Sequence, residues 1–130
     1  MITGADAIPL GTLLTARIFE VPKYQRAYAW EADEVSDFVR DITVLTTTHA
    51  AGGTPGPHFF GGLVSIDIQS GQVASGIKYE VVDGQQRLAT FFLTVAATVR
   101  GLRRLADDAK NQGDNAIEAQ AGGHAQTLER

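Results

Sequence analysis

The passage from a strand-like run straight into a helical pattern at Asp83-Gly84 constrains the fold of this chain more than any other feature. Residues 78–82 (KYEVV) have the composition of a strand. Beyond the polar string DGQQR, apolar residues return at helical spacing and predict a helix over about residues 85–104. A helix that begins directly after a strand leaves its first backbone N–H groups without partners inside the helix. Those N–H groups therefore need partners from outside the helix, and the DGQQR string stands beside them.

Every residue of the DGQQR string suits an anion site. Gly84 lets the backbone approach a ligand closely or adopt a positive φ. Gln85 and Gln86 carry amide donors and acceptors, and the planar fork of Arg87 matches phosphate or carboxylate. Asp83 can cap the helix, hold a Mg²⁺ that a nucleotide brings, or orient a water. An ordinary Asp-Gly turn, with Asp83 as the cap and Arg87 as a surface charge, explains the same spacing, so the residues alone leave both interpretations open.

A second polar segment, YQRAYAW, follows a predicted strand at residues 17–21 that is closed by Pro22. An arginine and an amide flanked by aromatic rings can hold a phosphate and stack on a base. The aromatic residues Tyr28 and Trp30 are equally explained as anchors that fix the loop on the core. Because a Gln-Arg pair follows each of two predicted strands, we expect the two segments to form two walls of one anion site. The residues of the facing wall are Tyr24, Gln25 and Arg26.

The remaining patterns predict a small mixed α/β domain. Apolar residues at helical spacing, preceded by acidic residues, predict a helix over about residues 31–47. The stretch at residues 58–69 (HFFGGLVSIDIQ) predicts a strand whose Gly61-Gly62 pair indicates a bulge or a close approach by another backbone. A short helix or turn is expected at residues 5–15. The order strand, helix, strand, strand, helix gives a sheet covered by the long second helix, while the strand pairing does not follow from the pattern.

The length and local composition predict one domain followed by a tail. The chain has 130 residues, enough for one modest core, and residues 1–106 are expected to form it. Residues 107–130 are rich in Ala, Gln, Asn and Gly, with Ile117 and Leu128 as their only sizeable aliphatic side chains. This composition predicts a weakly structured tail, truncated from a longer protein.

Composition and motifs exclude several classes of function. A formal net charge of −4 argues against binding nucleic acid non-specifically over the whole surface. The absence of cysteine excludes thiol nucleophiles and thiolate metal sites, and no P-loop motif is present. Three histidines, expected in loops, lack the spacing of metal ligands: His49, His58 and His124. Without a leader or an apolar run of about 20 residues, we expect a cytoplasmic protein with no membrane partner.

Three motifs, taken in order, resemble the N-terminal domain of the GmrSD family of modification-dependent (type IV) restriction endonucleases, which also occurs in phosphorothioate-sensing antiphage proteins. They are VPKYQRAYAWE, FFGGLVSI and VVDGQQRLATFFL, and the resemblance covers about residues 8–105. The second motif fits loosely, and Ala89 stands where Thr is frequent. In the wider superfamily the pattern is similar to ParB and sulfiredoxin, which implies a mixed sheet with flanking helices. Sulfiredoxin chemistry needs a cysteine, and this chain has none.

The resemblance implies a nucleotide-binding domain that hydrolyses NTP with Mg²⁺ and regulates a restriction or antiphage protein. It also implies a nuclease in a separate C-terminal domain or partner subunit, so DNA cleavage is not expected of this chain, and DNA contact is expected through the full-length protein. The alternative is a non-catalytic domain that binds DNA or senses modified DNA with the same anion pocket. The implied roles are catalytic for Asp83, Gln86 and Arg87, metal-binding for Asp83, and nucleotide-binding for Tyr24, Gln25, Arg26, Gly84, Gln85 and Arg87.

Overall fold

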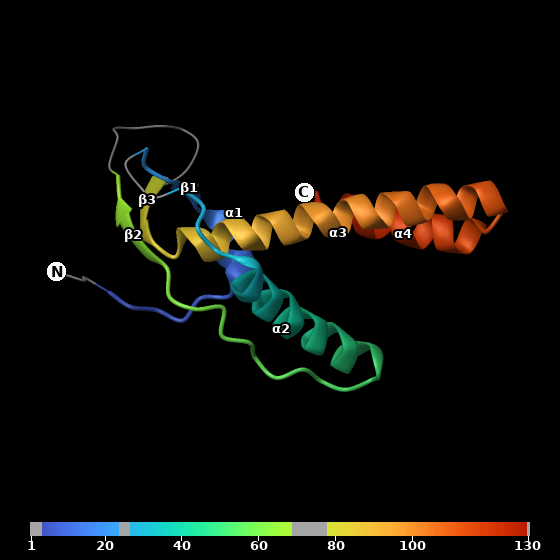
Figure 1. The fold of residues 1–130 in the computed structure, drawn as a ribbon, viewed down its shortest axis with the longest axis horizontal. Coiled ribbons are helices and arrows are strands. Elements are labelled where there is room, and N and C mark those ends of the chain that lie inside the picture. Colours follow the sequence, from blue (N-terminus) through green and yellow to red (C-terminus); the bar gives the residue numbers. More distant parts are fainter. Residues whose placement is uncertain (1–3, 24–26, 69–77, 130) are drawn as a thin grey trace. The chain divides into compact units, whose positions relative to one another are not determined.

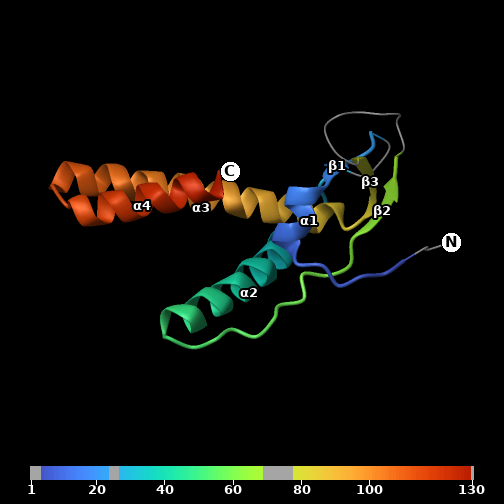
Figure 2. The same ribbon diagram turned by 180° about the vertical axis from the view of Figure 1, so that it is seen from behind.

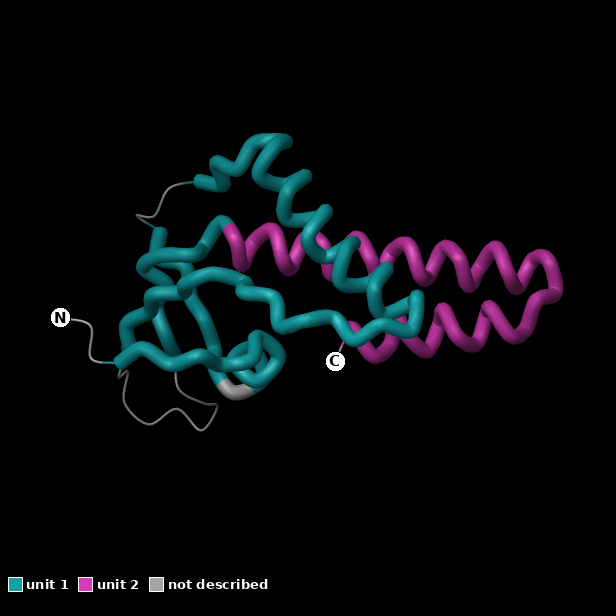
Figure 3. Tube along the Cα trace, turned by 90° about the horizontal axis from the view of Figure 1, so that it is seen from below, with its two compact units in different colours: residues 1–86 teal, residues 87–130 magenta. Residues whose placement is uncertain are grey.

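The computed structural model describes residues 4–23, 27–68 and 78–129, and it confirms the mixed α/β class (Figures 1 and 2). Contacts divide the chain into two compact units, residues 1–86 and 87–130 (Figure 3). The elements of the described residues are α1 (Leu10–Ala16), β1 (Ile18–Glu20), α2 (Ala32–Ala50), β2 (Val64–Asp67), β3 (Lys78–Asp83), α3 (Gln85–Gln112) and α4 (Asn115–Leu128).

The strands form a mixed sheet in the order β1-β3-β2. β1 pairs with β3 in parallel, and β2 pairs with β3 in the antiparallel sense. A parallel pair needs a long connection, and here that connection contains α2 and β2. The central strand carries Val81, whose side chain is fully buried. β3 is hydrogen-bonded to a neighbouring strand on each side. These bonds fix the position at which β3 ends and α3 begins.

An aromatic cluster holds the start of α2 in the first unit. The ring of Phe38 is buried, and its centroid lies 6.2 Å from that of Trp30 and 6.1 Å from that of Phe60. These separations are typical of interacting aromatic pairs. Trp30 is therefore an anchor for the loop that precedes α2, whereas the side chain of Tyr28 is 46% exposed.

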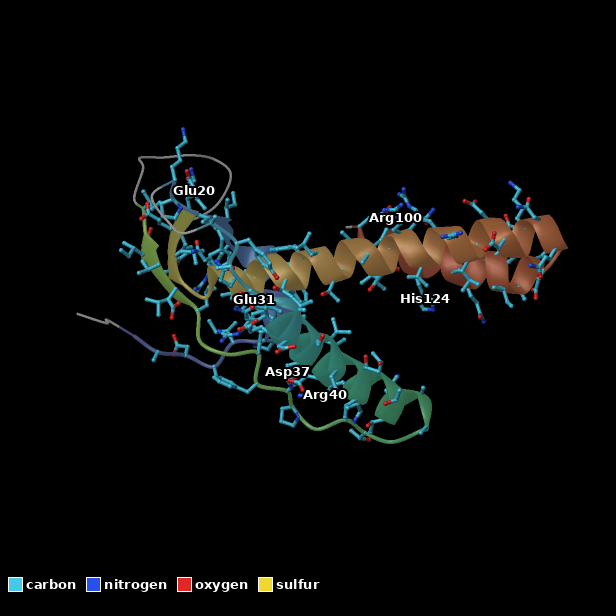
Figure 4. All side chains as sticks on the ribbon, in the orientation of Figure 1. Glu20, Glu31, Asp37, Arg40, Arg100 and His124 are labelled. Atoms are coloured by element: carbon cyan, nitrogen blue, oxygen red, sulfur yellow. The ribbon has the colours of Figure 1, made fainter. Side chains whose placement is uncertain are left out.

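Local hydrogen bonds and charges define the start of α2. The Glu34 carboxylate accepts a hydrogen bond of 2.9 Å from the backbone N–H of Glu31, which satisfies a group at the helix N-terminus. Figure 4 shows Glu31 at this end and Asp37 and Arg40 further along the helix. The side chains of Asp37 and Arg40 form an ion pair of 2.9 Å. The acidic first turn that was expected from the sequence is present.

The second unit is a helical hairpin, although the sequence predicts weak structure from residue 107 onward. Residue 106, the expected domain boundary, lies inside α3, which continues to Gln112. Gly113, with a φ of +76°, follows the helix, and the Asp114 carboxylate then caps α4 by accepting from the Ile117 N–H at 3.1 Å. Three alanines are buried in this unit: Ala109, Ala121 and Ala125.

Alanine explains the difference between the expected tail and the observed helices. The separation of two packed helices depends on the side chains at their contact, so small residues permit a close approach. α3 and α4 run side by side in the second unit (Figure 3). An ion pair of 2.5 Å between Arg103 and Glu129 joins the two helices. Burial of the alanine methyl groups thus stabilises the helical hairpin. A composition poor in large aliphatic residues does not indicate this kind of packing.

Replacing Gly101 by alanine is expected to raise the free energy of unfolding by about 0.5–1 kcal/mol. Gly101 lies inside α3, and an added Cβ would meet nothing within 4 Å. The matched control is Gly113→Ala, which also adds a Cβ in open space but at a positive φ. The control should lower stability by about 1 kcal/mol. Urea denaturation measures both, and a loss of stability in Gly101→Ala would contradict the expectation.

Candidate functional site

A single residue, Gly84, separates β3 from α3. Its φ is +91°, and a Cβ at this position would lie 2.9 Å from the carbonyl oxygen of Gly62 and 3.0 Å from the Leu63 Cδ1 atom. Of the two roles expected for Gly84, a close approach to a ligand or a positive φ, the structure has the positive φ. Of the two alternatives expected for the Gly61-Gly62 pair, a bulge or a close approach by another backbone, the structure has the close approach. The turn requires glycine because another part of the backbone occupies the space that a side chain would need.

Asp83 ends β3 next to this turn, and its side chain is exposed. Among the described residues, no group of three His, Asp or Glu side chains is placed to hold a metal ion. Mg²⁺ commonly keeps several waters and binds through one or two carboxylates together with substrate phosphates. Asp83 could supply one carboxylate ligand to a Mg²⁺ that is held mainly by phosphates and water.

Gln85 and Arg87 lie in the first turn of α3, and both are half-buried. The Oε1 atom of Gln85 is buried. The backbone N–H groups at a helix start carry partial positive charge and favour anions. The sequence thus places an amide and a guanidinium at the end of α3 that attracts negative charge.

Gln86 connects this turn to the loop that precedes α2. Its Oε1 accepts a hydrogen bond of 2.8 Å from the backbone N–H of Ala29, and its Nε2 donates one of 3.2 Å to the carbonyl of Ala27. Both partners are backbone groups of fixed polarity, so they determine the orientation of the amide. The start of α3 and residues 27–29, which are far apart in the sequence, are therefore adjacent in the fold.

Tyr24, Gln25 and Arg26 lie outside the described residues, so the facing wall stays a prediction. Arg26 directly precedes Ala27 in the chain, and Ala27 is bonded to Gln86. The contributions of Ala27 and Ala29 were missed from the sequence. They act through backbone groups, which every residue carries, and alanine side chains give no polar signal.

Two of the three histidines lie in helices. His49 lies in the last turn of α2 and His124 in α4 (Figure 4), whereas both were expected in loops. His58 lies outside helices and strands. In the parts of the chain that the structure describes, no helix has the length and apolar character needed to cross a membrane.

A small mixed sheet whose central strand passes through Asp-Gly into a long helix defines the general class, an α/β domain with a polar strand-to-helix turn. The chain matches the sequence model of the GmrSD restriction endonuclease, N-terminal domain, over residues 10–127, and it belongs to this family. The match confirms the resemblance carried by the three motifs and extends it into α4. No curated protein sequence matches the chain.

Proposed function

We propose that this domain binds a nucleoside triphosphate, with the phosphates at the turn formed by residues 83–87, and that it hydrolyses the nucleotide to regulate a restriction or antiphage protein. The observation that carries the proposal is the link between Gln86 and residues 27–29. This link brings the chain that continues from Arg26 to the start of α3. Ala27 follows the first predicted Gln-Arg segment in the sequence, and Gln86 belongs to the second, which supports the proposal that the two segments form one site.

The backbone of the turn and the side chains of Asp83 and Arg87 have separate roles in this proposal. The N–H groups at the start of α3 and the guanidinium of Arg87 bind phosphate oxygens. Asp83 supplies one carboxylate ligand to Mg²⁺ or orients the attacking water, and Mg²⁺ neutralises charge on the phosphates when bound. Tyr24, Gln25 and Arg26 provide the facing wall. Phosphate recognition at a glycine-containing helix start does not require a P-loop.

Saturating Mg-ATP or Mg-GTP is expected to raise the melting temperature of the domain. A ligand at 100 times its Kd stabilises the native state by about 2.7 kcal/mol. In a chain of this size that corresponds to roughly 10 °C. Differential scanning fluorimetry measures the shift, and adenosine is the matched control because it lacks phosphates. An equal shift with adenosine, or no shift with any nucleoside triphosphate, would contradict the proposal.

Duplex DNA in the same assay tests the alternative of a non-catalytic DNA-binding or modified-DNA sensing domain. Stabilisation by DNA alone, falling steeply as salt rises, would favour that alternative. The formal net charge of −4 argues against strong binding by phosphate contacts alone. We therefore expect nucleotide to have the larger effect on the isolated domain.

A further inference from the structure

We infer that Gln86 is a positioning residue, which fixes residues 27–29 against the start of α3, beside the turn at which we propose that the phosphates bind. The inference rests on the proposed function. It differs from the catalytic role implied by the family resemblance, because it assigns Gln86 no contact with reacting atoms. Its basis is a pair of hydrogen bonds within the first unit.

The geometry of this pair resembles the pairing of adjacent strands. The C=O of Ala27 and the N–H of Ala29 lie on either side of Tyr28 in the chain, and the amide of Gln86 bonds to both. In an antiparallel sheet, the peptide groups of a facing strand bond to such groups. The side-chain amide thus supplies the one donor and the one acceptor that a facing strand would supply, and it holds the backbone of the loop.

The glutamine amide supplies both the acceptor and the donor that these partners require. Glutamate offers acceptors but no donor when ionised, and methionine has similar length but offers neither. Asparagine has the same amide on a side chain that is one methylene shorter. Turning the Gln86 amide toward a substrate would break both bonds to the loop. The side chain is therefore suited to hold the loop rather than to act on a nucleotide.

Burial of side chains contributes little to the position of this loop, so its hydrogen bonds to the Gln86 amide contribute relatively more. The side chains of Ala27, Tyr28 and Ala29 are exposed. Trp30, in the aromatic cluster with Phe38, holds the loop at its other end. Without the amide, the docked loop conformation would be populated for a smaller fraction of the time. The apparent Kd of a ligand rises in inverse proportion to the fraction of binding-competent molecules.

Hydrogen exchange at the Ala29 amide tests the link without any nucleotide. In ligand-free Gln86→Met, we expect the Ala29 N–H to exchange about tenfold faster than in the wild-type chain. Gln86→Glu keeps an acceptor for this N–H and should keep its protection. Thermal unfolding by circular dichroism checks that each variant is folded. Unchanged exchange at Ala29 in a folded Gln86→Met variant would overturn the inference.

Nucleotide binding and turnover test the functional consequence, with Mg-ATP as the probe. Gln86→Met should raise the Kd about tenfold and leave the turnover of bound nucleotide unchanged. A smaller rise is expected for Gln86→Glu, which retains one of the two bonds. Gln112→Met, at the exposed end of α3, is the control and should alter neither quantity.

The two hypotheses fail in different ways. A loss of turnover at unchanged Kd in Gln86→Met would indicate a catalytic role and overturn the inference. If the wild-type chain binds no nucleoside triphosphate, the proposed function fails, and Ala29 exchange still decides whether Gln86 holds the loop.

Discussion

Replacing Gly84 by alanine is expected to lower the free energy of unfolding by about 2–4 kcal/mol, from backbone strain together with steric overlap. At a φ of +91° a Cβ is strained regardless of the space around it. That Cβ would also lie 2.9 Å from the Gly62 carbonyl oxygen and 3.3 Å from the Leu63 Cα. Both are backbone atoms, so a change of side-chain rotamer cannot relieve the overlap. The loss is large compared with a total stability of about 5–15 kcal/mol for a typical domain.

Urea denaturation of Gly84→Ala measures this loss, and Gly62→Ala is the matched control. A Cβ on Gly62 would meet nothing within 4 Å. The control should therefore change the free energy of unfolding by no more than about 0.5 kcal/mol. Equal stability of the two variants would show that the close approach of the turn to Gly62 does not occur in solution.

The strand-to-helix turn was predictable because its determinants are local. A strand, an Asp-Gly pair and a helical pattern follow one another without a gap, and the structure has β3, Gly84 and α3 in that order. The parallel pairing of β1 with β3 is a contact between distant segments, and a pattern of alternating residues does not encode it. The sequence therefore indicates the elements and the turn but not the arrangement of the sheet.

Two further features escaped prediction for separate physical reasons. α4 buries the small residues Ala121 and Ala125, whereas a composition poor in large aliphatic side chains predicts weak structure. Gln86 bonds to the backbone groups of Ala27 and Ala29. Every residue type carries such groups, so the sequence does not indicate these partners. Family membership identifies the motif residues. The fold adds that one of them, Gln86, is hydrogen-bonded to the loop at residues 27–29.

Replacing Arg87 by alanine is expected to weaken Mg-ATP binding by about 100-fold. A hydrogen bond to a charged group contributes about 1.5–3 kcal/mol, and a loss of about 2.7 kcal/mol corresponds to this factor. Arg87→Lys keeps the charge but loses the planar fork, so it should fall between alanine and the wild type. Arg104→Ala removes an exposed guanidinium from the same helix and should leave the Kd unchanged. Isothermal titration calorimetry measures all four proteins.

Unchanged affinity in a folded Arg87→Ala variant would remove Arg87 from the phosphate site. The double variant with Gln86→Met asks a further question, because the two residues are neighbours with different proposed roles. If both act on the same bound phosphates, Arg87 directly and Gln86 through the loop, their effects on the free energy of binding should not add. Additive effects would mean that the loop and the guanidinium contribute to binding independently, and the two Gln-Arg segments would then not form one site.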